Sequence, residues 1–178
     1  MVLNNGTLMI RPATADDAQT LCSWWNDGLV MAHAGFTNGL GLTSNEVIEK
    51  LRSGRELHHR FILEIAGIPA GEMSCRNTAP RTVEIGIKIC LPDQQNQGYG
   101  TAFLKMFIRF LFEEQEVHKI QLDTNLKNYR AQHVYTKLGF RRCAVHFDSW
   151  RNQIGELQSF IEYEMTTEDY SQLPLACL

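Results

Sequence analysis

Apolar and polar residues alternate most regularly in residues 83–89. A period of two is typical of a strand with one buried face. The content of β-branched and aromatic residues, bounded by turn residues, predicts further strands at 7–11, 60–65, 70–76, 119–123, 140–146 and 156–165. In residues 83–89 the aliphatic side is Val83, Ile85, Ile87 and Ile89, and the other side is Glu84, Gly86 and Lys88.

Other segments repeat their apolar residues at helical spacing. Helices are predicted at 16–27, from residue 44 onward, after Gly98 and at 130–138, with Thr14 and Ser44 as N-caps and Gly139 as the terminating residue. The stretch 32–42 contains three glycines, and we expect it to be a mobile loop. The clearest helical face is Phe103, Met106, Phe107, Phe110 and Leu111.

The predicted elements run strand, two helices, three strands, helix, strand, helix and two strands. This order predicts an α/β (α+β) domain around one central sheet. It lacks the regular alternation of a doubly wound fold, which argues against a dinucleotide-binding domain. The length of 178 residues suits one domain. We assign it residues 1–170 and treat 171–178 as a C-terminal tail.

Charge and hydropathy exclude several classes of protein. The net charge of -3 argues against nucleic-acid binding that depends on phosphate contacts, because such binding requires a basic face. No apolar run is long enough to span a bilayer, and the first residues lack the basic and apolar regions of a signal peptide. We therefore expect a cytoplasmic protein with neither a membrane nor a nucleic-acid partner.

The cysteines and histidines follow no pattern of a metal or nucleophile site. The 5 cysteines are scattered and form no C-x-x-C pair, which favours buried reduced thiols over disulfides or a zinc site. The 6 histidines show no ligand spacing such as H-E-x-x-H. No G-x-S-x-G motif supports a serine hydrolase. The sequence predicts no metal.

A glycine-containing segment after the 83–89 strand is the first candidate for chemistry. Two glycines at alternate positions can take positive φ and keep side chains off the surface, and the amides of the following helix N-terminus attract an anion. A Walker loop would need a lysine directly after the second glycine, and a Rossmann fingerprint would need glycine where Phe103 stands. A pyrophosphate loop of the form Q/R-x-x-G-x-G/A and a simple capped helix both stay open. The segment is Gln95, Asn96, Gln97, Gly98, Tyr99, Gly100 and Thr101.

A second segment closely resembles a signature of the GNAT superfamily of N-acetyltransferases. In that family a strand leads into N-x-R-A-x-x-x-Y and a K-L-G-F turn, and Asn128, Arg130, Ala131, Tyr135 and residues 137–140 match in register. The likeness covers residues 8–168. Trp25-Asn26-Asp27 resembles the branch of the ribosomal-protein N-terminal acetyltransferases, with similarity to polyamine and aminoglycoside acetyltransferases. The resemblance implies the GNAT fold, a central mixed, mostly antiparallel sheet flanked by helices.

The resemblance also implies acetyl-CoA as co-substrate and direct attack of an amine on the thioester, through a tetrahedral intermediate. Backbone groups of Lys88, Ile89 and Cys90 would pair with the pantetheine arm and supply an oxyanion donor. Residues 95–101 would hold the pyrophosphate. Asn128 would hydrogen-bond the pantetheine arm, with Ala131 beside it.

Two further roles complete the expected site. Tyr135 is the expected general acid, because a phenol with a pKa of about 10 carries a proton at neutral pH. Glu84 is the expected general base, with Glu72 or an ordered water as alternatives. Trp24, Trp25 and Phe36 are candidates for the wall of the acceptor cleft, and plain core packing is the alternative for the tryptophans.

The implied acceptor is a primary amine, either a small molecule such as a polyamine or an aminoglycoside, or a peptide N-terminus. The resemblance also implies a homodimer. Two other functions stay open at this point. One is a catalytically inactive CoA-binding sensor or scaffold, and the other is a nucleotide-binding module that uses the glycine loop.

Overall fold

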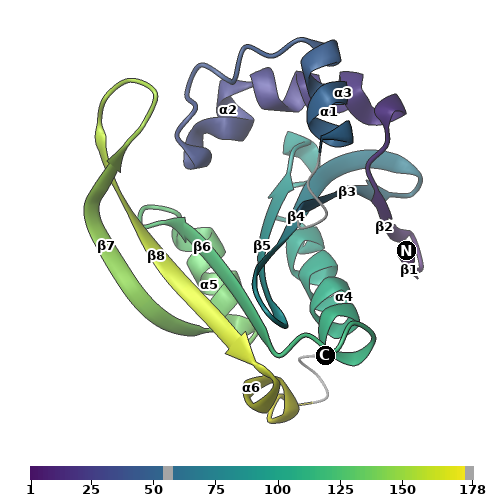
Figure 1. Ribbon diagram of the computed structural model, residues 1–178, viewed down its shortest axis with the longest axis vertical. Coiled ribbons are helices and arrows are strands. Elements are labelled where there is room, and N and C mark those ends of the chain that lie inside the picture. The colour runs from purple at the N-terminus through teal and green to yellow at the C-terminus, as the bar shows by residue number, and fades with distance from the viewer. Residues whose placement is uncertain (54–57, 175–178) are drawn as a thin grey trace.

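Eight strands form one sheet in the order β1-β2-β3-β4-β5-β6-β8-β7 (Figure 1). The computed structural model describes residues 1–53 and 58–174. Neighbouring strands are antiparallel except β5 and β6, which are parallel, so the sheet is mixed and mostly antiparallel as expected. The strands are β1 (Leu3–Asn5), β2 (Leu8–Pro12), β3 (His58–Ile65), β4 (Ile68–Ala79), β5 (Thr82–Ile89), β6 (Lys119–Asn125), β7 (Arg141–Arg151) and β8 (Leu157–Thr166).

Helices cover both faces of the sheet. The larger core joins one sheet face to α4 and α5, and Phe103 and Phe107 of α4 are fully buried in it. A smaller core joins α1 and α3 to Ile62 of β3 on the other face. The helical segments are η1 (Ala15–Asp17), α1 (Ala18–Asn26), α2 (Gly28–Met31), η2 (Ala32–Ala34), α3 (Ser44–Arg52), η3 (Pro92–Gln94), α4 (Tyr99–Glu113), α5 (Tyr129–Lys137) and α6 (Thr167–Ser171).

Strands β5 and β6 pair over only three residues each, 82–84 with 119–121. Beyond Glu84 the two strands diverge, as Figure 1 shows, although β5 stays paired with β4 and β6 with β8. Val83 and Ile85 are buried in the larger core, whereas Ile87 and Ile89 continue the same strand face but line an open cleft. The alternation therefore predicted the strand correctly, and the cleft begins where the partner strand departs.

Several local expectations need correction. The N-cap of α3 is Thr43 and not Ser44, because the Thr43 hydroxyl accepts from the Glu46 amide and the Glu46 carboxylate accepts from the Thr43 amide. Thr14 is the N-cap of the first helical turn, η1, as predicted, and it also forms a capping box with Asp17. The sequence pattern missed the short β1 and the terminal α6, and β4 extends to Ala79.

Residues 32–42 are tied to the β7–β8 hairpin. Gln153 donates from its backbone amide to the Gly35 carbonyl at 2.8 Å, and its side chain bonds the Asn38 amide and the Gly39 carbonyl. Gly35 lies so close to the Trp150 ring that a Cβ there would stand 2.4 Å from it. The segment includes η2 and is anchored to the β7–β8 hairpin, in contrast to the mobile loop that we expected.

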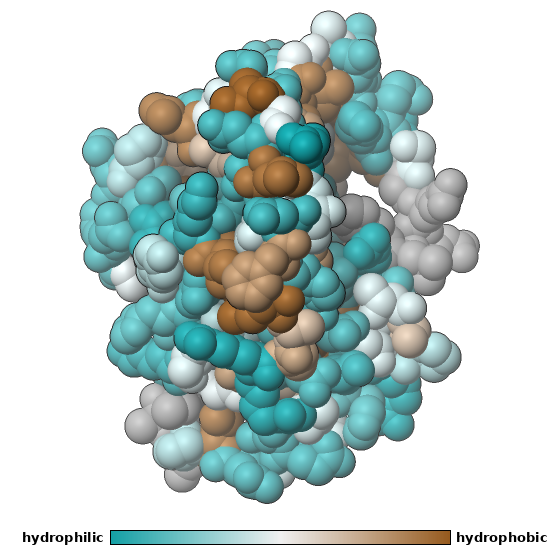
Figure 2. All heavy atoms as spheres, turned by 90° about the vertical axis from the view of Figure 1, so that its left-hand side faces the viewer, coloured by the Kyte–Doolittle hydropathy of each residue, from teal (hydrophilic) through white to brown (hydrophobic). Residues whose placement is uncertain are grey.

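Strand β7 is the outer border of the sheet and pairs only with β8. Two register shifts and a left-handed Asp148 with φ of 46° interrupt it, which discourages pairing with another chain. Figure 2 shows this side of the molecule as mostly hydrophilic, with separate apolar clusters; the exposed apolar residues of β7 are Val145 and Phe147. The homodimer stays a prediction.

The remaining fold expectations concern membrane-spanning segments and the C-terminal end of the domain. No helix among the described residues is long and apolar enough to cross a membrane, and the cytoplasmic location stays a prediction. At the C-terminal end, the Tyr170 ring stacks on Phe112 and Leu173 packs against the larger core. The domain boundary at residue 170 stays a prediction, but packing continues past it.

Candidate active site

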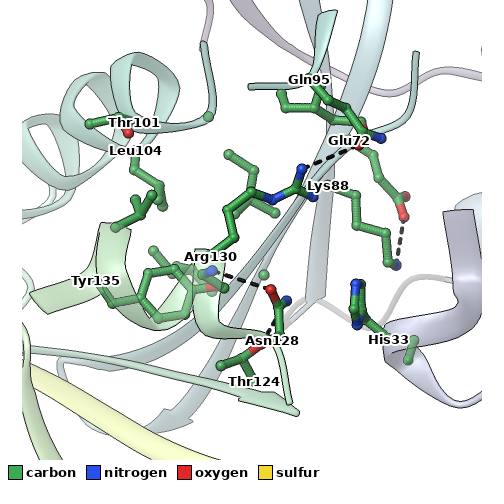
Figure 3. Close-up of a pocket in the computed structure, with 18 of the residues that line it drawn as sticks. His33, Glu72, Lys88, Gln95, Thr101, Leu104, Thr124, Asn128, Arg130 and Tyr135 are labelled. Carbon is green, nitrogen blue, oxygen red and sulfur yellow. Dashed lines mark hydrogen bonds and ion pairs between the residues drawn. The ribbon is translucent and has the colours of Figure 1, made fainter. Parts of the chain in front are cut away.

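A cleft of about 650 Å³ opens where β5 leaves β6 (Figure 3). Its walls come from β5 and the neighbouring strands β3, β4 and β6, from α4 and α5, and from α2 and η2. Most of the residues that the sequence indicated lie in this one cleft. They are Glu84, Lys88, Ile89, Gln95, Asn96, Gly98, Tyr99, Gly100, Thr101, Asn128, Ala131 and Tyr135. Cys90 and Gln97 are not among the lining residues; Gln97 bonds back to the Asp93 carbonyl.

The N-terminus of α4 is left open toward the cleft. Its N-cap is Gly98, with a left-handed φ of 85°, and no side chain among residues 1–53 and 58–174 caps the helix. Side chains of Asp27, Thr43, Asn128 and Thr166 cap α2, α3, α5 and α6, whereas α1, which continues from η1, also has no side-chain cap. The first amides of α4 have no acceptor within the helix, so they and the helix dipole are available to an anion.

The two glycines of the loop differ in their conformations. Only Gly98 takes a positive φ, and the second left-handed residue is Asn96 with φ of 61°. Gly100 is an ordinary residue of α4, so only one of the two glycines adopts the positive φ that either could take. A Cβ at Gly100 would meet only Ile89 Cγ1 at 3.8 Å, an ordinary contact. The fold therefore does not require glycine at position 100, and its absent side chain leaves space in the cleft.

Arg130 joins the two motifs across the cleft. Its guanidinium donates from the first turn of α5 to Gln95 Oε1 at 3.3 Å and Asn96 Oδ1 at 3.1 Å, as Figure 3 shows for Gln95. Arg130 was matched within the sequence signature but was not expected to be a site residue. Its position in N-x-R-A, beside a phosphate-loop candidate, was the available signal.

The free edge of β5 presents the backbone of Ile89. Gln95 Nε2 donates to the Ile89 carbonyl at 2.9 Å on this side. Because successive residues of a strand point their backbone groups to opposite edges, Lys88 and Cys90 face β4. The Lys88 carbonyl lies against Gly71, and the Cys90 amide donates to the Ala70 carbonyl at 2.8 Å. Of the three residues expected to pair with pantetheine, only Ile89 has its backbone on the open edge.

Asn128 is held in place by its own helix and strand. Its Oδ1 accepts from the Ala131 amide at 3.2 Å, which caps α5, and its Nδ2 donates to Thr124 Oγ1 at 3.1 Å. One donor hydrogen and one acceptor lone pair remain for a ligand, because an amide side chain can form up to four bonds. The sequence match therefore corresponds to a fixed polar group on the cleft wall.

Tyr135 lines the cleft from α5 and is only 6% exposed. Its ring packs edge-on against Tyr163 and near Phe140. Burial raises the pKa of the Tyr135 phenol well above its ordinary value, and Asp123 and Tyr163 raise it further. The phenol therefore keeps its proton throughout the neutral range and can act as an acid.

The model of the acetyltransferase (GNAT) domain family matches residues 7–141. The chain belongs to this family. Part of this GNAT chain is 34% identical over 83 residues to the spermidine N(1)-acetyltransferase of Escherichia coli strain K12, covering 46% of the chain and 44% of that protein. It is 35% identical over 65 residues to a kanamycin resistance protein of Rhizobium radiobacter, covering 36% and 60%. The chain thus spans about half the length of the relatives it matches.

A solved structure shares the whole fold. The spermidine N-acetyltransferase of Vibrio cholerae, in complex with CoA and spermine, has a TM-score of 0.81 and 21% identity, over 94% of this chain and 100% of that one. This likeness confirms the GNAT fold that the sequence resemblance implied.

Glu72 is the most buried carboxylate among the described residues of this GNAT domain, with 2% exposure. It accepts from Arg60 at 2.6 Å, from Trp25 Nε1 at 3.0 Å and from Lys88 at 3.1 Å, the last shown in Figure 3. Burial alone would raise the pKa of Glu72, but Arg60, Lys88 and Trp25 outweigh burial and hold the pKa below its ordinary value. A carboxylate whose ionised form is stabilised in this way is a poor proton acceptor. This argues against Glu72 as the alternative general base.

Glu84 and Asp123 lie where the strands part. Arg76 forms an ion pair with Glu84 at 2.7 Å, and both side chains are partly exposed. Asp123 lines the same cleft from β6 and was not singled out by sequence reasoning. The walls of the cleft partly desolvate the Asp123 carboxyl and raise its pKa, and repulsion by Glu84 and Glu162 raises the pKa further, while Arg76 lowers it. The residue as a whole stays exposed. Its position at a strand end beside the GNAT signature was the available signal.

The remaining sequence expectations concern tryptophans, cysteines and a metal site. Trp24 and Trp25 are buried in the smaller core, so core packing is the correct interpretation for both, and neither they nor Phe36 belong to the cleft lining. Cys22, Cys75 and Cys90 are buried free thiols, whereas Cys143 is exposed and Cys177 lies outside the described residues. Across residues 1–53 and 58–174 no group of His, Cys, Asp and Glu has the arrangement of a metal site.

Proposed function

We propose that this protein is an acetyl-CoA-dependent N-acetyltransferase that acetylates a primary amine by direct attack through a tetrahedral intermediate. The observation that carries the proposal is the convergence of the uncapped α4 N-terminus, the free edge of β5 and the Tyr135 phenol on one cleft. The α4 N-terminus supplies a site for the CoA phosphates, the β5 edge supplies backbone groups for the thioester-bearing arm, and Tyr135 supplies an acid. Acetyl transfer from acetyl-CoA requires all three.

The cleft residues fit coenzyme A in chemistry and in space. The α4 amides, the Thr101 hydroxyl and the Arg130 guanidinium form a donor-rich site for the pyrophosphate. The open backbone edge at Ile87 and Ile89 suits the amides of the pantetheine arm, and Asn128 faces it across the cleft. An amide of this edge would serve as the donor to the developing oxyanion.

Gly100→Val tests the cofactor half of the proposal. The added side chain should occupy the space for the pyrophosphate and weaken CoA binding by roughly tenfold or more, about 1.4 kcal/mol. Valine has a higher helix propensity than glycine and meets no backbone at this position, so the melting temperature without CoA should not fall. Isothermal titration with CoA and thermal unfolding measure the two effects. Unchanged CoA affinity would contradict the pyrophosphate assignment.

The proposed chemistry assigns the acid to Tyr135 and the base to Glu84. Tyr135 would protonate the leaving thiolate of CoA, and Glu84 would accept the proton of the amine, directly or through water. Arg76 keeps the Glu84 carboxylate oriented on the cleft side of β5. The alternative base is an ordered water.

Glu84→Gln should remove the acidic limb of the pH–rate profile if Glu84 is the base. Kcat at neutral pH should fall by roughly 10²-fold, the usual contribution of a general base. Arg76→Gln is the matched control, because it removes the same ion pair and leaves the carboxylate. If Glu84→Gln keeps the acidic limb and most of the turnover, water is the base.

The acceptor is tested by a thiol-release screen with acetyl-CoA. The relatives named above suggest polyamines and aminoglycosides as the first acceptors, followed by amino acids and N-terminal peptides. Steady turnover with any amine would eliminate the inactive CoA-binding sensor. CoA binding without turnover on the whole panel would favour that sensor, and stabilisation by ATP but not CoA would favour a nucleotide-binding module.

A further inference from the structure

Residues 28–39, which contain α2 and η2, form a compact unit at the end of α1. A Cβ at Gly28 would stand 2.0 Å from the Thr37 carbonyl oxygen, so the start of the unit packs directly on its later part. A Cβ at Gly39 would stand 2.2 Å from the Asn26 carbonyl oxygen of α1. Such close backbone contacts leave little freedom within the segment. We call residues 28–39 the α2–η2 unit and expect it to move as one body.

The α2–η2 unit forms one wall of the cleft. Cα atoms of η2 lie within 8 Å of Cα atoms of β6, so the unit reaches across the place where β5 and β6 part. Figure 3 shows His33 of this unit beside Lys88, on the opposite side of the pocket from Thr101. The groups that fit CoA belong to the α4 and α5 side, and the α2–η2 unit therefore borders the space that is left for the amine. Its lining residues are Leu29, Val30, His33 and Ala34.

Gln153 attaches the α2–η2 unit to the β7–β8 hairpin through three hydrogen bonds. Its amide donates to the Gly35 carbonyl at 2.8 Å, and its Nε2 donates to the Gly39 carbonyl at 2.9 Å. Its Oε1 accepts from the Asn38 amide at 2.8 Å. In the described chain, every other hydrogen bond of residues 28–39 stays within the unit or goes to Asp27. Gln153 therefore supplies all the hydrogen bonds that join this wall to a distant segment.

The hairpin turn presents Gln153 in a fixed position. Asn152 Oδ1 accepts from the amides of Ile154 at 3.2 Å and Glu156 at 2.9 Å, and the Gly155 amide donates to the Asn152 carbonyl at 2.9 Å. Gln153 itself is exposed, and ordering an exposed glutamine costs side-chain entropy that offsets much of what its hydrogen bonds contribute. Its contacts consequently determine where the α2–η2 unit lies and add little to the stability of the core.

We propose that Gln153 is a positioning residue for the acceptor, because it holds the α2–η2 unit where the amine binds and so sets the affinity for the amine without touching it. The proposal rests on the proposed acetyl transfer at the same cleft. Among the described residues that line the cleft, none belongs to the hairpin, residues 141–166, so Gln153 acts through the α2–η2 unit. Gln153 also lies outside residues 7–141, which the family model matches, so membership of the family does not assign this role.

The test is the kinetics of Gln153→Ala. The variant loses the bonds to Asn38 and Gly39 but keeps its amide bond to Gly35. The α2–η2 unit should then occupy other positions as well, and part of the binding energy of the amine is needed to restore the competent one. The KM for the amine should rise by roughly threefold to tenfold, while kcat at saturating amine and the Kd of CoA stay as in the wild-type protein.

Initial rates of thiol release and isothermal titration with CoA measure these three quantities. The amine is the fastest acceptor of the panel, with spermidine and kanamycin tried first. Ile154→Ala is the matched control and should leave the KM unchanged, because it alters an exposed side chain of the same turn and keeps the bonds of Gln153. Gln153→Glu should raise the KM as Gln153→Ala does, because a carboxylate cannot donate to the Gly39 carbonyl.

Hydrogen exchange gives a second readout, which does not depend on activity. The Asn38 amide is bonded to the Gln153 side chain, so it should exchange roughly tenfold faster in Gln153→Ala than in the wild-type protein. Amides of the central strands β3 and β4 should exchange at wild-type rates. This contrast distinguishes a local release of the α2–η2 unit from a general loss of stability.

The outcomes separate this inference from the proposed function. An unchanged amine KM in Gln153→Ala would overturn the role of Gln153 while acetyl transfer itself stands. A fall in kcat or in CoA affinity that accounts for the loss, or an equal rise in KM with Ile154→Ala, would overturn it also, because Gln153 would then support the fold in general. If the wild-type protein acetylates no amine of the panel, the proposed function fails and this inference fails with it.

Discussion

Tyr135→Phe should lower kcat by roughly 10²-fold or more, the usual contribution of a general acid, and leave the affinity for acetyl-CoA almost unchanged. The substitution removes only the phenolic oxygen. The ring is 6% exposed and packs against Tyr163 and Phe140, so phenylalanine should keep the same packing and the same position in α5. The loss is therefore expected in the chemical step. Initial rates with saturating amine and varied acetyl-CoA measure it.

Tyr163→Phe is the matched control for this experiment. Its hydroxyl is buried and has no hydrogen-bond partner among the described residues, and it does not line the cleft. Removing an unsatisfied buried hydroxyl should leave turnover intact and should not destabilise the protein. Full turnover in Tyr135→Phe, or a weakened acetyl-CoA affinity that accounts for the whole loss, would contradict the role of Tyr135 as the acid.

The pH dependence should distinguish the acid from the base. Burial, Asp123 and Tyr163 all raise the pKa of Tyr135, so its phenol stays protonated to a higher pH than the ordinary value of 10.0. The wild-type rate should therefore show no basic limb from Tyr135 in the neutral range. A basic limb near neutral pH that disappears in Tyr135→Phe would show that the environment of the phenol differs from this structure.

Sequence patterns predicted those elements of the fold whose conformation is determined by residues close together in the sequence. Alternation at 83–89 predicted β5, helical spacing predicted α4, and the order of elements together with the family resemblance predicted the mixed sheet. The residues of the two motifs also converge on one cleft. Motifs predict well here because a glycine loop and a helix N-terminus are local structures.

Features that join distant segments could not be predicted in this way. Gln153 holds residues 35–39 through hydrogen bonds that span more than a hundred positions, and neither segment shows a pattern that indicates the other. The backbone direction at Lys88 and Cys90 depends on the register with β4, which alternation alone does not fix. Within the described part of the chain Arg76 forms its ion pair with Glu84 and not with Asp123, and this choice of partner is a property of the folded sheet.

The contacts of Glu72 join distant segments and are expected to contribute strongly to the free energy of unfolding. Glu72→Gln should therefore destabilise the protein by about 3–5 kcal/mol. The substitution leaves Arg60 and Lys88 without their buried counter-charge, and it weakens the bond from Trp25, which joins α1 to the sheet. Urea unfolding at neutral pH measures the loss. Glu84→Gln is the matched control, because its ion pair with Arg76 lies on the same sheet but is partly exposed to solvent, and it should cost less than about 1 kcal/mol.

The same carboxylate should make stability depend on pH in a defined direction. The pKa of Glu72 in the folded protein lies below its ordinary value of 4.5, so the folded state holds the proton less tightly than the unfolded chain does. The stabilisation is therefore complete above pH 4.5 and is lost as the pH falls toward the folded pKa. Below pH 4.5 the unfolding free energy of the wild-type protein should fall more steeply than that of Glu72→Gln. Parallel pH profiles of the two proteins would show that Glu72 is not held ionised by Arg60 and Lys88.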